Sequence, residues 1–549
     1  MAEKIKIIPL GGIGEIGKNL TVYEYGGEIL LVDCGLSFPD DEMYGIDLVI
    51  PDFSYLIKNK NRIRGLVIAH GHEDHIGAIT YLLREISCPI YSTRLASGLI
   101  SIKLEEAKLS DKAELHTVEA GQTIRLGQFS VEFIRVNHSI ADSVALAITT
   151  RMGVIIHTGD FKVDTTPVEG EIIDLARFGE LGKNGVLALL SDSTNAERAG
   201  YAMSERKVGE ALDNLFRGCE NRIVVTTFAS NVHRLQQIID AAVRHGRKVA
   251  ITGRSMENIL RLSIQLDYID IPPGTIIETT QVKSLPRSKV CVITTGSQGE
   301  PMSALSRMAV GAHRQLELIA GDRVIISSNA IPGNEKSVSS VINELFMRGC
   351  EVIYEKLADV HVSGHACQEE LKLMLALTRP KYFMPVHGEY RMLKVHCALA
   401  RQTGVDPKNA FIPELGRVFE ITAQSAKLGS YVTAGRVLLD GSGVGDVGTV
   451  IMRDRKILAE DGLVVVAITL EDANIVSGPD ITTRGFALSK ESEPILEAMR
   501  KAALDVLYEC EGQGIDLQSI KAQIKHAVGD VTFKRTRRRP LILPVILEM

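Results

Sequence analysis

The feature that most constrains this chain is the string His-Gly-His-Glu-Asp-His at residues 70 to 75. It follows the apolar run Gly-Leu-Val-Ile-Ala at 65 to 69, which predicts a short buried strand that ends in a loop. Imidazole and carboxylate groups are ligands of zinc and manganese. The string therefore predicts a metal site, with a solvated polar turn as the alternative. The candidate ligands are His70, His72, Asp74 and His75.

Three further ligand residues stand where other predicted strands end. His138 follows VEFIRVN, Asp160 follows GVIIHTG, and His387 follows YFMPV. Open α/β sheets gather their sites at the carboxyl ends of strands, so we expect these residues to join the cluster. Two ions about 3.5 to 4 Å apart need roughly this number of ligands, with one bridging carboxylate. The sequence thus predicts a dinuclear site, although each residue taken alone could simply be a packed or capping side chain.

A glycine motif near the N-terminus imitates a nucleotide site. Gly12, Gly14 and Gly17 fit G-x-G-x-x-G, and the P-loop pattern fails only at Asn19, which replaces the Ser or Thr that would bind magnesium. Both motifs require a helix next, but the β-branched and aromatic run LTVYEY follows. We therefore predict a strand-turn-strand hairpin here.

The rest of the chain alternates β-rich runs with helical patterns, which indicates an α/β fold. At 549 residues the chain is expected to hold three or four domains. Apolar residues at three- and four-residue spacing predict a helix at 76–86, directly after the ligand string. The expected strands are 29–33, 65–69, 131–136, 144–149, 153–157, 186–191, 222–227, 289–294, 322–327 and 381–385.

Composition sets few limits on function. The net charge of -6 neither favours nor excludes a nucleic-acid partner, so a basic contact surface would have to be local. The chain has no secretory signal pattern and no uncharged apolar stretch of about 18 residues, so we expect a cytoplasmic protein with no membrane contact. The eight cysteines include no Cys-x-x-Cys pair, which predicts reduced thiols.

The residue pattern of the sequence changes after about residue 430. A glycine-rich stretch, GSGVGDVG at 441–448, precedes a separate strand pattern and a predicted helix at 491–509. These features predict a linker and a small terminal domain. Its basic run at 534–539, Lys-Arg-Thr-Arg-Arg-Arg, is either an RNA contact or an exposed charged face.

The motifs as a set resemble a known family. HGHEDHIG, HSIAD at 138–142, HTGDFKVD at 157–164 and Asp33 look like the metallo-β-lactamase motifs. SDSTN at 191–195, VSGHA at 362–366 and PVHGE at 385–389 look like the signatures of its nucleic-acid-processing β-CASP branch. With the opening LGGIGEIGKN, the run FPDDEMYGIDLVIPD and the ending RRRPLILPVI, the chain resembles the ribonuclease J family over essentially its whole length.

This resemblance implies an architecture. It predicts a metallo-β-lactamase αββα sandwich interrupted by an inserted β-CASP α/β domain and followed by a small α/β C-terminal domain. The expected bounds are 1–203 and 358–430 for the metallo-β-lactamase domain, 204–357 for the β-CASP domain, 431–456 for a linker and 457–549 for a dimerisation domain. RNA would run between the first two domains.

The resemblance also implies roles for the ligands. Two zinc or manganese ions would be held by His70, His72 and His138, by Asp74, His75 and His387, and by Asp160 as the bridge. Asp33 would orient ligands from behind, as carboxylates near metal-bound histidines do. A water shared by two such ions loses a proton near neutral pH. His365, oriented by Asp192, would protonate the leaving ribose oxygen; a phosphate-binding role for His365 is the alternative.

Family members bind the 5'-monophosphate of RNA in a short loop, here His361, Val362, Ser363, Gly364 and His365. Two imidazoles, a hydroxyl and a bare glycine backbone suit an anion. Ser328 is expected to join this loop, and Ser230, Asn231 and His233 are expected along the RNA path with the loop at 294–301. Some members carry a structural calcium ion. By position its ligands would be Gly45, Asp47 and Asp440, and ordinary turn aspartates are the alternative.

The expected function is that of a ribonuclease with 5'-to-3' exonuclease and endonuclease activity on single-stranded RNA, in messenger RNA decay and ribosomal RNA maturation. We expect a homodimer or homotetramer, with a paralogous subunit as a further option. Two alternatives stand beside it. A lactonase or thioesterase of another metallo-β-lactamase branch should lack the β-CASP signatures, and an inactive structural paralogue should have lost ligands that this chain retains.

Overall fold

The computed structural model describes residues 3–40, 42–168, 170–298, 300, 303–331, 334–441, 448–471, 474–486, 493–511 and 516–548. These form two compact units. The larger unit comprises Met1–Ser37 and Val49–Val437, and the smaller unit comprises Phe38–Leu48 and Leu438–Met549. Most of the expected glycine-rich linker, residues 442–447, lies outside the described residues.

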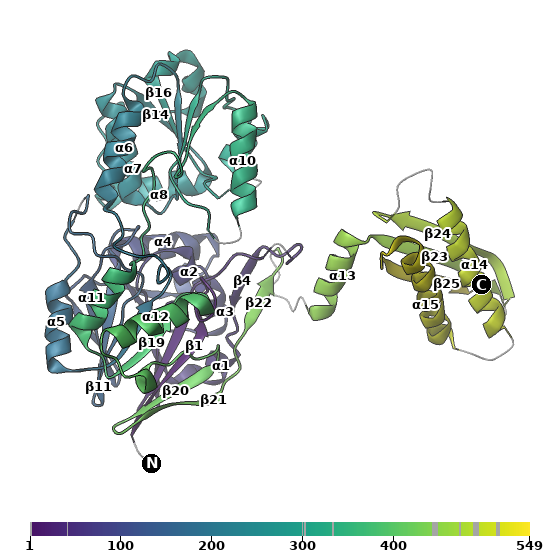
Figure 1. Ribbon diagram of the computed structural model, residues 1–549, viewed down its shortest axis with the longest axis horizontal. Helices are drawn as coiled ribbons and strands as arrows, with labels where there is room; N and C mark the ends of the chain where they lie inside the picture. The colour runs from purple at the N-terminus through teal and green to yellow at the C-terminus, as the bar shows by residue number, and fades with distance from the viewer. Residues whose placement is uncertain are drawn as a thin grey trace. The chain divides into compact units, whose positions relative to one another are not determined.

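The larger unit begins with an eight-stranded mixed sheet (Figure 1). Its order is β21-β20-β1-β2-β3-β5-β6-β7. The strands are β1 (Lys4–Gly11), β2 (Leu20–Tyr25), β3 (Glu28–Val32), β5 (Ile63–Val67), β6 (Pro89–Ser92), β7 (Glu114–Thr117), β20 (Arg417–Thr422) and β21 (Ala426–Tyr431). Because β3 and β5 are parallel neighbours, Asp33 and the ligand string leave the sheet at the same edge.

A second sheet packs face to face on the first. Its order is β19-β12-β11-β10-β9-β8, and its inward side chains, such as Phe133 and Leu146, share one core with Ile7 and Leu30 of the first sheet. The strand β10 is buried almost throughout and therefore reads as a continuous apolar run. The strands are β8 (Thr123–Leu126), β9 (Phe129–Arg135), β10 (Val144–Thr150), β11 (Gly153–His157), β12 (Val186–Asp192) and β19 (Tyr382–Val386).

Helices cover the two outer faces of this sandwich. On the second sheet, Phe178 of α5 and Leu371 of α11 pack against Ile156 and Phe383, and Figure 1 shows α5, α11 and α12 on that side. The helices of this part are α1 (Ser54–Lys58), α2 (Glu73–Ile76), α3 (Ile79–Glu85), α4 (Arg94–Glu106), α5 (Leu175–Asn184), α11 (Gln368–Thr378) and α12 (Tyr390–Gln402), with 3-10 turns at Lys60–Arg62, Ser110–Lys112 and Pro407–Asn409. The predicted αββα sandwich is confirmed.

The inserted part of the larger unit is a parallel sheet of order β15-β14-β16-β13-β17-β18. Figure 1 shows α6 and α7 on one side of this sheet and α10 on the other. Its strands are β13 (Ile223–Thr226), β14 (Lys248–Thr252), β15 (Ile276–Ile277), β16 (Val290–Thr294), β17 (Arg323–Ile326) and β18 (Glu351–Ile353). Its helices are α6 (Glu205–Phe216), α7 (Val232–Arg244), α8 (Arg254–Gln265), α9 (Ala304–Ala309) and α10 (Glu335–Met347), with 3-10 turns at Thr279–Ser284 and Arg287–Lys289.

The smaller unit is built on a three-stranded sheet, β24-β23-β25, whose buried face packs on two helices. Alternate residues of β23 are buried, as expected for a strand with one covered face. The elements are α13 (Thr449–Glu460), β23 (Leu463–Glu471), β24 (Asn474–Arg484), α14 (Glu493–Cys510), α15 (Leu517–Thr536) and β25 (Leu541–Glu548). The strands β4 (Leu48–Pro51) and β22 (Arg436–Leu439) form a separate two-stranded sheet.

Most predicted elements are present, and one prediction needs correction. Each of the ten expected strands overlaps an observed strand, and β1 and β2 form the antiparallel hairpin predicted in place of a nucleotide loop. The expected helix at 76–86 is instead two short helices, α2 and α3, separated at Gly77 and Ala78. A side chain at residue 77 would meet the Glu73 carbonyl and Leu36, so the chain turns where only glycine fits.

The cysteines and the helix lengths concern two further predictions. All eight cysteines are free thiols, as predicted. Among the described residues, no helix has both the length and the apolar character needed to cross a lipid bilayer. The exact domain bounds predicted from the sequence remain a prediction.

Candidate metal centre and phosphate loop

The ligand string lies where a buried strand gives way to a helix. Strand β5 ends at Val67, and His72 is the N-cap residue of α2, so His70 and His72 precede the helix while Asp74 and His75 lie in its first turn. This change from extended to helical backbone lets neighbouring residues direct their side chains into two adjacent groups. The buried position of His70 and His75 excludes the alternative of a solvated turn.

The first group is a cage of three imidazole nitrogens and one carboxylate oxygen. Nδ1 of His72 lies 3.0 Å from Nε2 of His70 and 3.1 Å from Nε2 of His138. Oδ2 of Asp160 lies 3.6 Å from the same nitrogen of His70 and 3.7 Å from that of His138. Ligands about 2.0 to 2.1 Å from a tetrahedral zinc ion stand roughly 3.3 Å apart, so these distances fit one ion.

The second group shares Asp160 with the first. Nε2 of His75 lies 3.3 Å from Oδ2 of Asp160 and 3.6 Å from Oδ2 of Asp74. Nε2 of His387 lies 3.2 Å from the same oxygen of Asp74. One carboxylate oxygen therefore faces both groups, which is the arrangement that a bridge between two ions requires. The structure brings all seven predicted ligands together.

The protonation of the first group suits metal ligation. Burial lowers the pKa of His72 to about 4 and lowers the pKa values of His70 and His138 well below the usual range. These rings are therefore neutral, with nitrogen lone pairs directed at one another. Nδ1 of His70 is buried and makes no hydrogen bond to any described residue. Neutral imidazoles that converge with carboxylates fit divalent cations, and the centre binds divalent metal.

Asp33 supports the second group from behind. It follows β3 with φ of 61°, and its Oδ1 accepts a hydrogen bond from the backbone N–H of Ala69 at 2.8 Å. Nδ1 of His75 donates to Oδ2 of Asp33, also at 2.8 Å. This bond fixes the tautomer and the ring plane of His75, so that Nε2 is directed into the cage.

A second pair of residues, His365 and Asp192, lies beside the cages. Nδ1 of His365 donates to Oδ2 of Asp192 at 2.8 Å and lies 3.9 Å from Oδ2 of Asp160. Oδ1 of Asp192 accepts hydrogen bonds from the backbone and hydroxyl of Thr194. Burial by itself would lower the pKa of His365, but the Asp192 carboxylate more than offsets it and raises the pKa above its usual value.

The predicted phosphate loop is joined to the first cage. Nδ1 of His138 donates to the carbonyl of Gly364 at 2.7 Å, and a Cβ at residue 364 would lie 2.7 Å from that same nitrogen. Only glycine allows this approach. Nδ2 of Asn195 donates to Oγ of Ser363 at 2.7 Å and to the carbonyl of His365 at 3.0 Å, while Val362 is buried.

Cationic side chains surround the start of this loop. Burial and then the charges of Arg234, Arg198 and Lys162 lower the pKa of His361 to about 3. Ser328, the other predicted phosphate ligand, is buried and donates to the carbonyl of Ser297 at 3.1 Å. A neutral imidazole among fixed positive charges is a favourable site for an anion.

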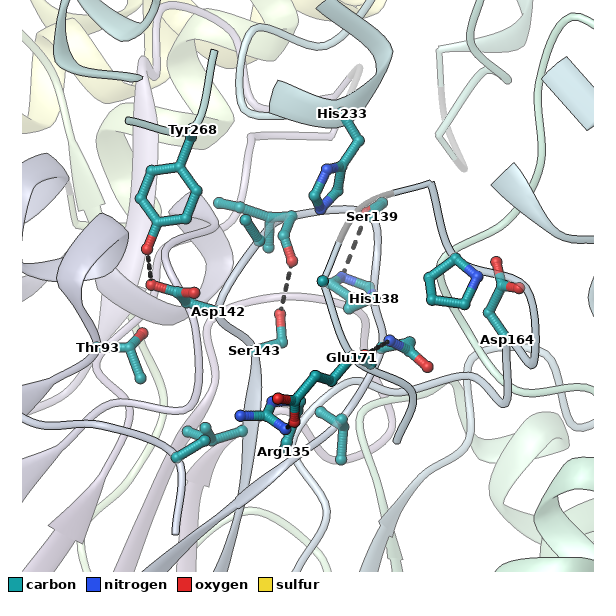
Figure 2. Close-up of a pocket in the computed structure, with 18 of the residues that line it drawn as sticks. Thr93, Arg135, His138, Ser139, Asp142, Ser143, Asp164, Glu171, His233 and Tyr268 are labelled. Atoms are coloured by element: carbon teal, nitrogen blue, oxygen red, sulfur yellow. Dashed lines mark hydrogen bonds and ion pairs between the residues drawn. The ribbon is translucent and has the colours of Figure 1, made fainter. Parts of the chain in front are cut away.

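A cavity of about 430 Å³ opens beside His138. Figure 2 shows it, with His138, Ser139, His233 and Tyr268 among the labelled residues that line it. Asn231 and His233 line the cavity, whereas Ser230 is not among the described residues that line it, and the RNA path stays a prediction. Asn231 also caps α7 by accepting a hydrogen bond from the backbone of Arg234 at 3.0 Å.

The predicted calcium ligands contact an arginine and a backbone amide in this structure. The Arg455 guanidinium donates to the carbonyls of Tyr44 and Gly45, each at 3.1 Å, and forms an ion pair with Asp440. Asp47 instead accepts a hydrogen bond from the backbone of Gly441 at 2.7 Å. A side-chain cation therefore lies among the oxygens expected to bind calcium, and the calcium site stays a prediction.

Several residues of the site were not predicted from the sequence. Lys162 lies inside the motif HTGDFKVD and Arg234 directly follows His233, but nothing in their spacing shows that both are buried beside the phosphate loop. Glu370 is fully buried and accepts hydrogen bonds from the backbone of Val163, Ala202 and Cys367, each at 2.7 Å. These are contacts between distant segments, which local sequence patterns do not reveal.

Comparison with known proteins agrees with this geometry. Four family models match: the metallo-β-lactamase superfamily at 13–162, the ribonuclease J β-CASP domain at 220–345, the Zn-dependent metallo-hydrolase RNA specificity domain at 351–413 and the ribonuclease J C-terminal domain at 450–549. A solved structure of a protein of unknown function from Enterococcus faecalis V583 shares the fold, with a TM-score of 0.55 and 17% identity, over 76% of this chain and 100% of that one.

Relatives match over nearly the full length. Ribonuclease J 1 of Streptococcus pyogenes serotype M3 is 45% identical, over 99% of this chain and 98% of that protein. Ribonuclease J2 of Bacillus subtilis strain 168 is 42% identical over 100% and 99%, and ribonuclease J of Synechocystis is 46% identical over 92% and 79%. With its domain models and full-length relatives in agreement, this chain belongs to the ribonuclease J family of the metallo-β-lactamase superfamily.

Proposed function

We propose that this chain is a metal-dependent ribonuclease that hydrolyses single-stranded RNA, both from a 5'-monophosphate end in the 5'-to-3' direction and at internal sites. The observation that carries the proposal is the pair of ligand cages that share Oδ2 of Asp160, with the His365–Asp192 pair 3.9 Å away. A lactonase or thioesterase should lack the β-CASP part. An inactive paralogue should have lost some of the seven ligands, all of which this chain retains.

The proposed cofactors are two zinc or manganese ions, whose identity follows availability because this ligand set accepts either. When bound, such ions lower the pKa of water and neutralise charge on a phosphodiester. The protein residues hold this centre in place. Asp160 keeps the two cages at a fixed separation, and the hydrogen bond from His75 to Asp33 prevents rotation of the His75 ring.

The proposed general acid is His365, which would protonate the leaving ribose oxygen. Its support is the 2.8 Å bond from Nδ1 to Asp192, which leaves Nε2 as the nitrogen that can transfer a proton. The Asp192 carboxylate raises the pKa of His365, which favours the protonated ring that an acid needs. A positioned acid of this kind contributes about 10²- to 10⁴-fold to a rate.

The proposed 5'-end site is the loop 361–365. Its support is the positive field of Lys162, Arg198 and Arg234 together with the contact between Gly364 and His138, which places the loop directly beside the first cage. The 430 Å³ cavity that His138 helps to line has room for a terminal nucleotide. We place such an enzyme in messenger RNA decay and ribosomal RNA maturation.

The test compares one RNA sequence with a 5'-hydroxyl, a 5'-monophosphate or a 5'-triphosphate. The proposal predicts fastest release of the terminal nucleotide from the monophosphate form, and similar cleavage of all three at internal sites. Ser363→Ala should reduce the preference, while Ser130→Ala, on strand β9, serves as a matched control. Equal release of the terminal nucleotide from all three RNAs would remove the 5'-end proposal.

We also propose that the chain forms a homodimer or homotetramer through its terminal domain, with a paralogous subunit as a further partner. The support is the face of the three-stranded sheet that lies opposite α14 and α15. On this face Val465 is the register partner of Leu543, and neither residue belongs to the buried core of the smaller unit. Leu543 and Leu547 are exposed. Exposed apolar patches of this kind mark association surfaces. Changing both leucines to aspartate should yield monomers in analytical ultracentrifugation, and an unchanged mass would contradict the proposal.

A further inference from the structure

Arg234 is a fully buried arginine in the inserted part, and it is hydrogen-bonded to the segment just before the phosphate loop. Its Nη1 donates to the carbonyl of Val360 at 3.0 Å, and to the carbonyl and hydroxyl of Ser327 at 3.1 and 2.6 Å. The Ser327 hydroxyl donates in turn to the same Val360 carbonyl at 2.6 Å. Three segments therefore meet at one guanidinium.

The charge of Arg234 is only partly used by these contacts. Nε forms an ion pair with Glu205, which is itself mostly buried. Nη2 is buried and makes no hydrogen bond to any described residue. An unpaired donor on a buried cation costs stability, so a guanidinium kept in this state suggests a use beyond packing. Its field already acts on the adjacent His361.

The phosphate loop is thus held at its two ends by different parts of the molecule. At its start, Arg234 and Ser327 bind the Val360 carbonyl, whereas near its end the metal-cage residue His138 binds the Gly364 carbonyl. A change at Arg234 should therefore move His361 and its neighbours while His365 and the cages stay in place. A substitution at Arg234 should therefore change the selection of the 5' end separately from hydrolysis.

We propose that Arg234 is the positioning residue that sets the preference for a 5'-monophosphate, because it fixes the Val360 carbonyl and so the start of the phosphate loop. This inference rests on the proposed 5'-end site and deepens it. Arg234 acts through the loop backbone and its field. It has no direct contact with the scissile bond.

The experiment uses Arg234→Gln, which removes the charge, and Arg234→Lys, which keeps the charge but cannot reproduce the three hydrogen bonds. Arg247→Gln is the matched control. Arg247 is also buried in the inserted part, and it donates to the carbonyls of Asn221 at 2.8 Å, Val290 at 3.0 Å and Cys219. It therefore loses comparable bonds at a place remote from the loop.

The readout is kcat/KM for release of the terminal nucleotide from 5'-monophosphate and 5'-hydroxyl RNA, with metal content and internal cleavage of a circular RNA measured in parallel. We expect the ratio of the two rates to fall about tenfold or more in both Arg234 variants, a loss typical of a charged hydrogen bond. The kcat/KM for internal cleavage of the circular RNA should fall by a smaller factor than this ratio, whether the change lies in kcat or in KM. The metal content should not change. Arg247→Gln should keep the ratio of the unmodified chain.

The outcomes separate this inference from the function on which it rests. If the unmodified chain itself showed no preference between the two ends, the proposed 5'-end site would fail and the role of Arg234 with it. If the unmodified chain discriminates and Arg234→Lys keeps the full ratio, only the role of Arg234 is contradicted. Should Arg234→Gln fail to fold, as a melting curve would show, the lysine variant decides alone.

Discussion

At the residue scale, His365 depends on Asp192 for its charge. Because the carboxylate stabilises the imidazolium, the pKa of His365 lies above its usual value despite burial. A group with a raised pKa holds its proton below that pKa and loses it as pH rises through it. Activity that needs this proton therefore declines on the alkaline side, at a higher pH than for a histidine of ordinary pKa.

Asp192→Asn should move that alkaline decline to lower pH and reduce the rate about tenfold or more, because the imidazolium loses its stabilising charge. The measurement is kcat/KM for RNA cleavage as a function of pH. Asp213→Asn is a matched control, since Asp213 forms a similar pair with His245 at 3.1 Å within the inserted part. An alkaline limb that stays in place in Asp192→Asn would rule out His365 as the acid.

Asp33→Ala should weaken metal binding by about 10- to 100-fold, because His75 loses the hydrogen bond that orients its ring. Metal affinity can be measured by competition with a fluorescent chelator. Asp52→Ala, a carboxylate that caps the backbone of Ser54 away from the cages, provides the comparison. Equal metal affinities in the two variants would contradict the orienting role of Asp33.

The ligands themselves could be predicted from the sequence because each follows a recognisable strand. His70, His138, Asp160 and His387 all stand just beyond apolar runs. Parallel neighbours bring together the ends of β11, β12 and β19, while β9, which precedes His138, pairs antiparallel with β10 and so runs in the same direction as β11. The role of Arg234 could not be predicted in this way. Its partners Glu205, Ser327 and Val360 are separated from it by 29, 93 and 126 residues, and only tertiary structure shows their contact.

At the element scale, the ligand string depends on a helix that ends early. The 3.6-residue periodicity after the string predicts one helix, and the apolar side chains it identifies, such as Ile79 and Leu82, are indeed buried. The break at Gly77 could not be predicted from periodicity, because the backbone N–H of Ala78 bonds to the Cys34 carbonyl of another loop at 3.0 Å instead of continuing the helix. Tertiary contact here overrides local propensity.

Helix α13 supplies a second element-scale prediction. The Arg455 guanidinium donates to the carbonyl of Gly45 and forms an ion pair with Asp440. Because these oxygens already have a cationic partner, added calcium should not raise the melting temperature of the unmodified chain. Arg455→Ala should cost less than about 1 kcal/mol, because the pair is partly exposed, and calcium should then become stabilising. Arg453→Ala, on the same helix and mostly exposed, is the control.

Calorimetric titration distinguishes the outcomes of this prediction. Stoichiometric calcium binding to the unmodified chain, lost in Asp440→Ala, would show that Arg455 gives way to the ion. Absence of calcium binding in both the unmodified chain and Arg455→Ala would show that these oxygens do not form a calcium site in any state.

At the scale of the whole molecule, the centre is assembled from segments spread over more than 300 residues, between His70 and His387. The two sheets of the sandwich deliver the ligands, and the insertion between β12 and β19 brings Arg234 to the phosphate loop. The α/β class and the sandwich follow from strand and helix patterns together with the family resemblance. The placement of the insertion on the loop follows from side-chain contacts that no pattern encodes.

The central claim is that two divalent ions held by the seven ligands drive RNA hydrolysis. The most direct measurement combines elemental analysis of metal with cleavage of a labelled single-stranded RNA, for the unmodified chain, His72→Ala and the exposed-site control His116→Ala. We predict about two ions per chain and full cleavage in the unmodified protein and in His116→Ala, with fewer ions and a loss of cleavage of about 10³-fold or more in His72→Ala. Unchanged metal content with full cleavage in His72→Ala would contradict the account.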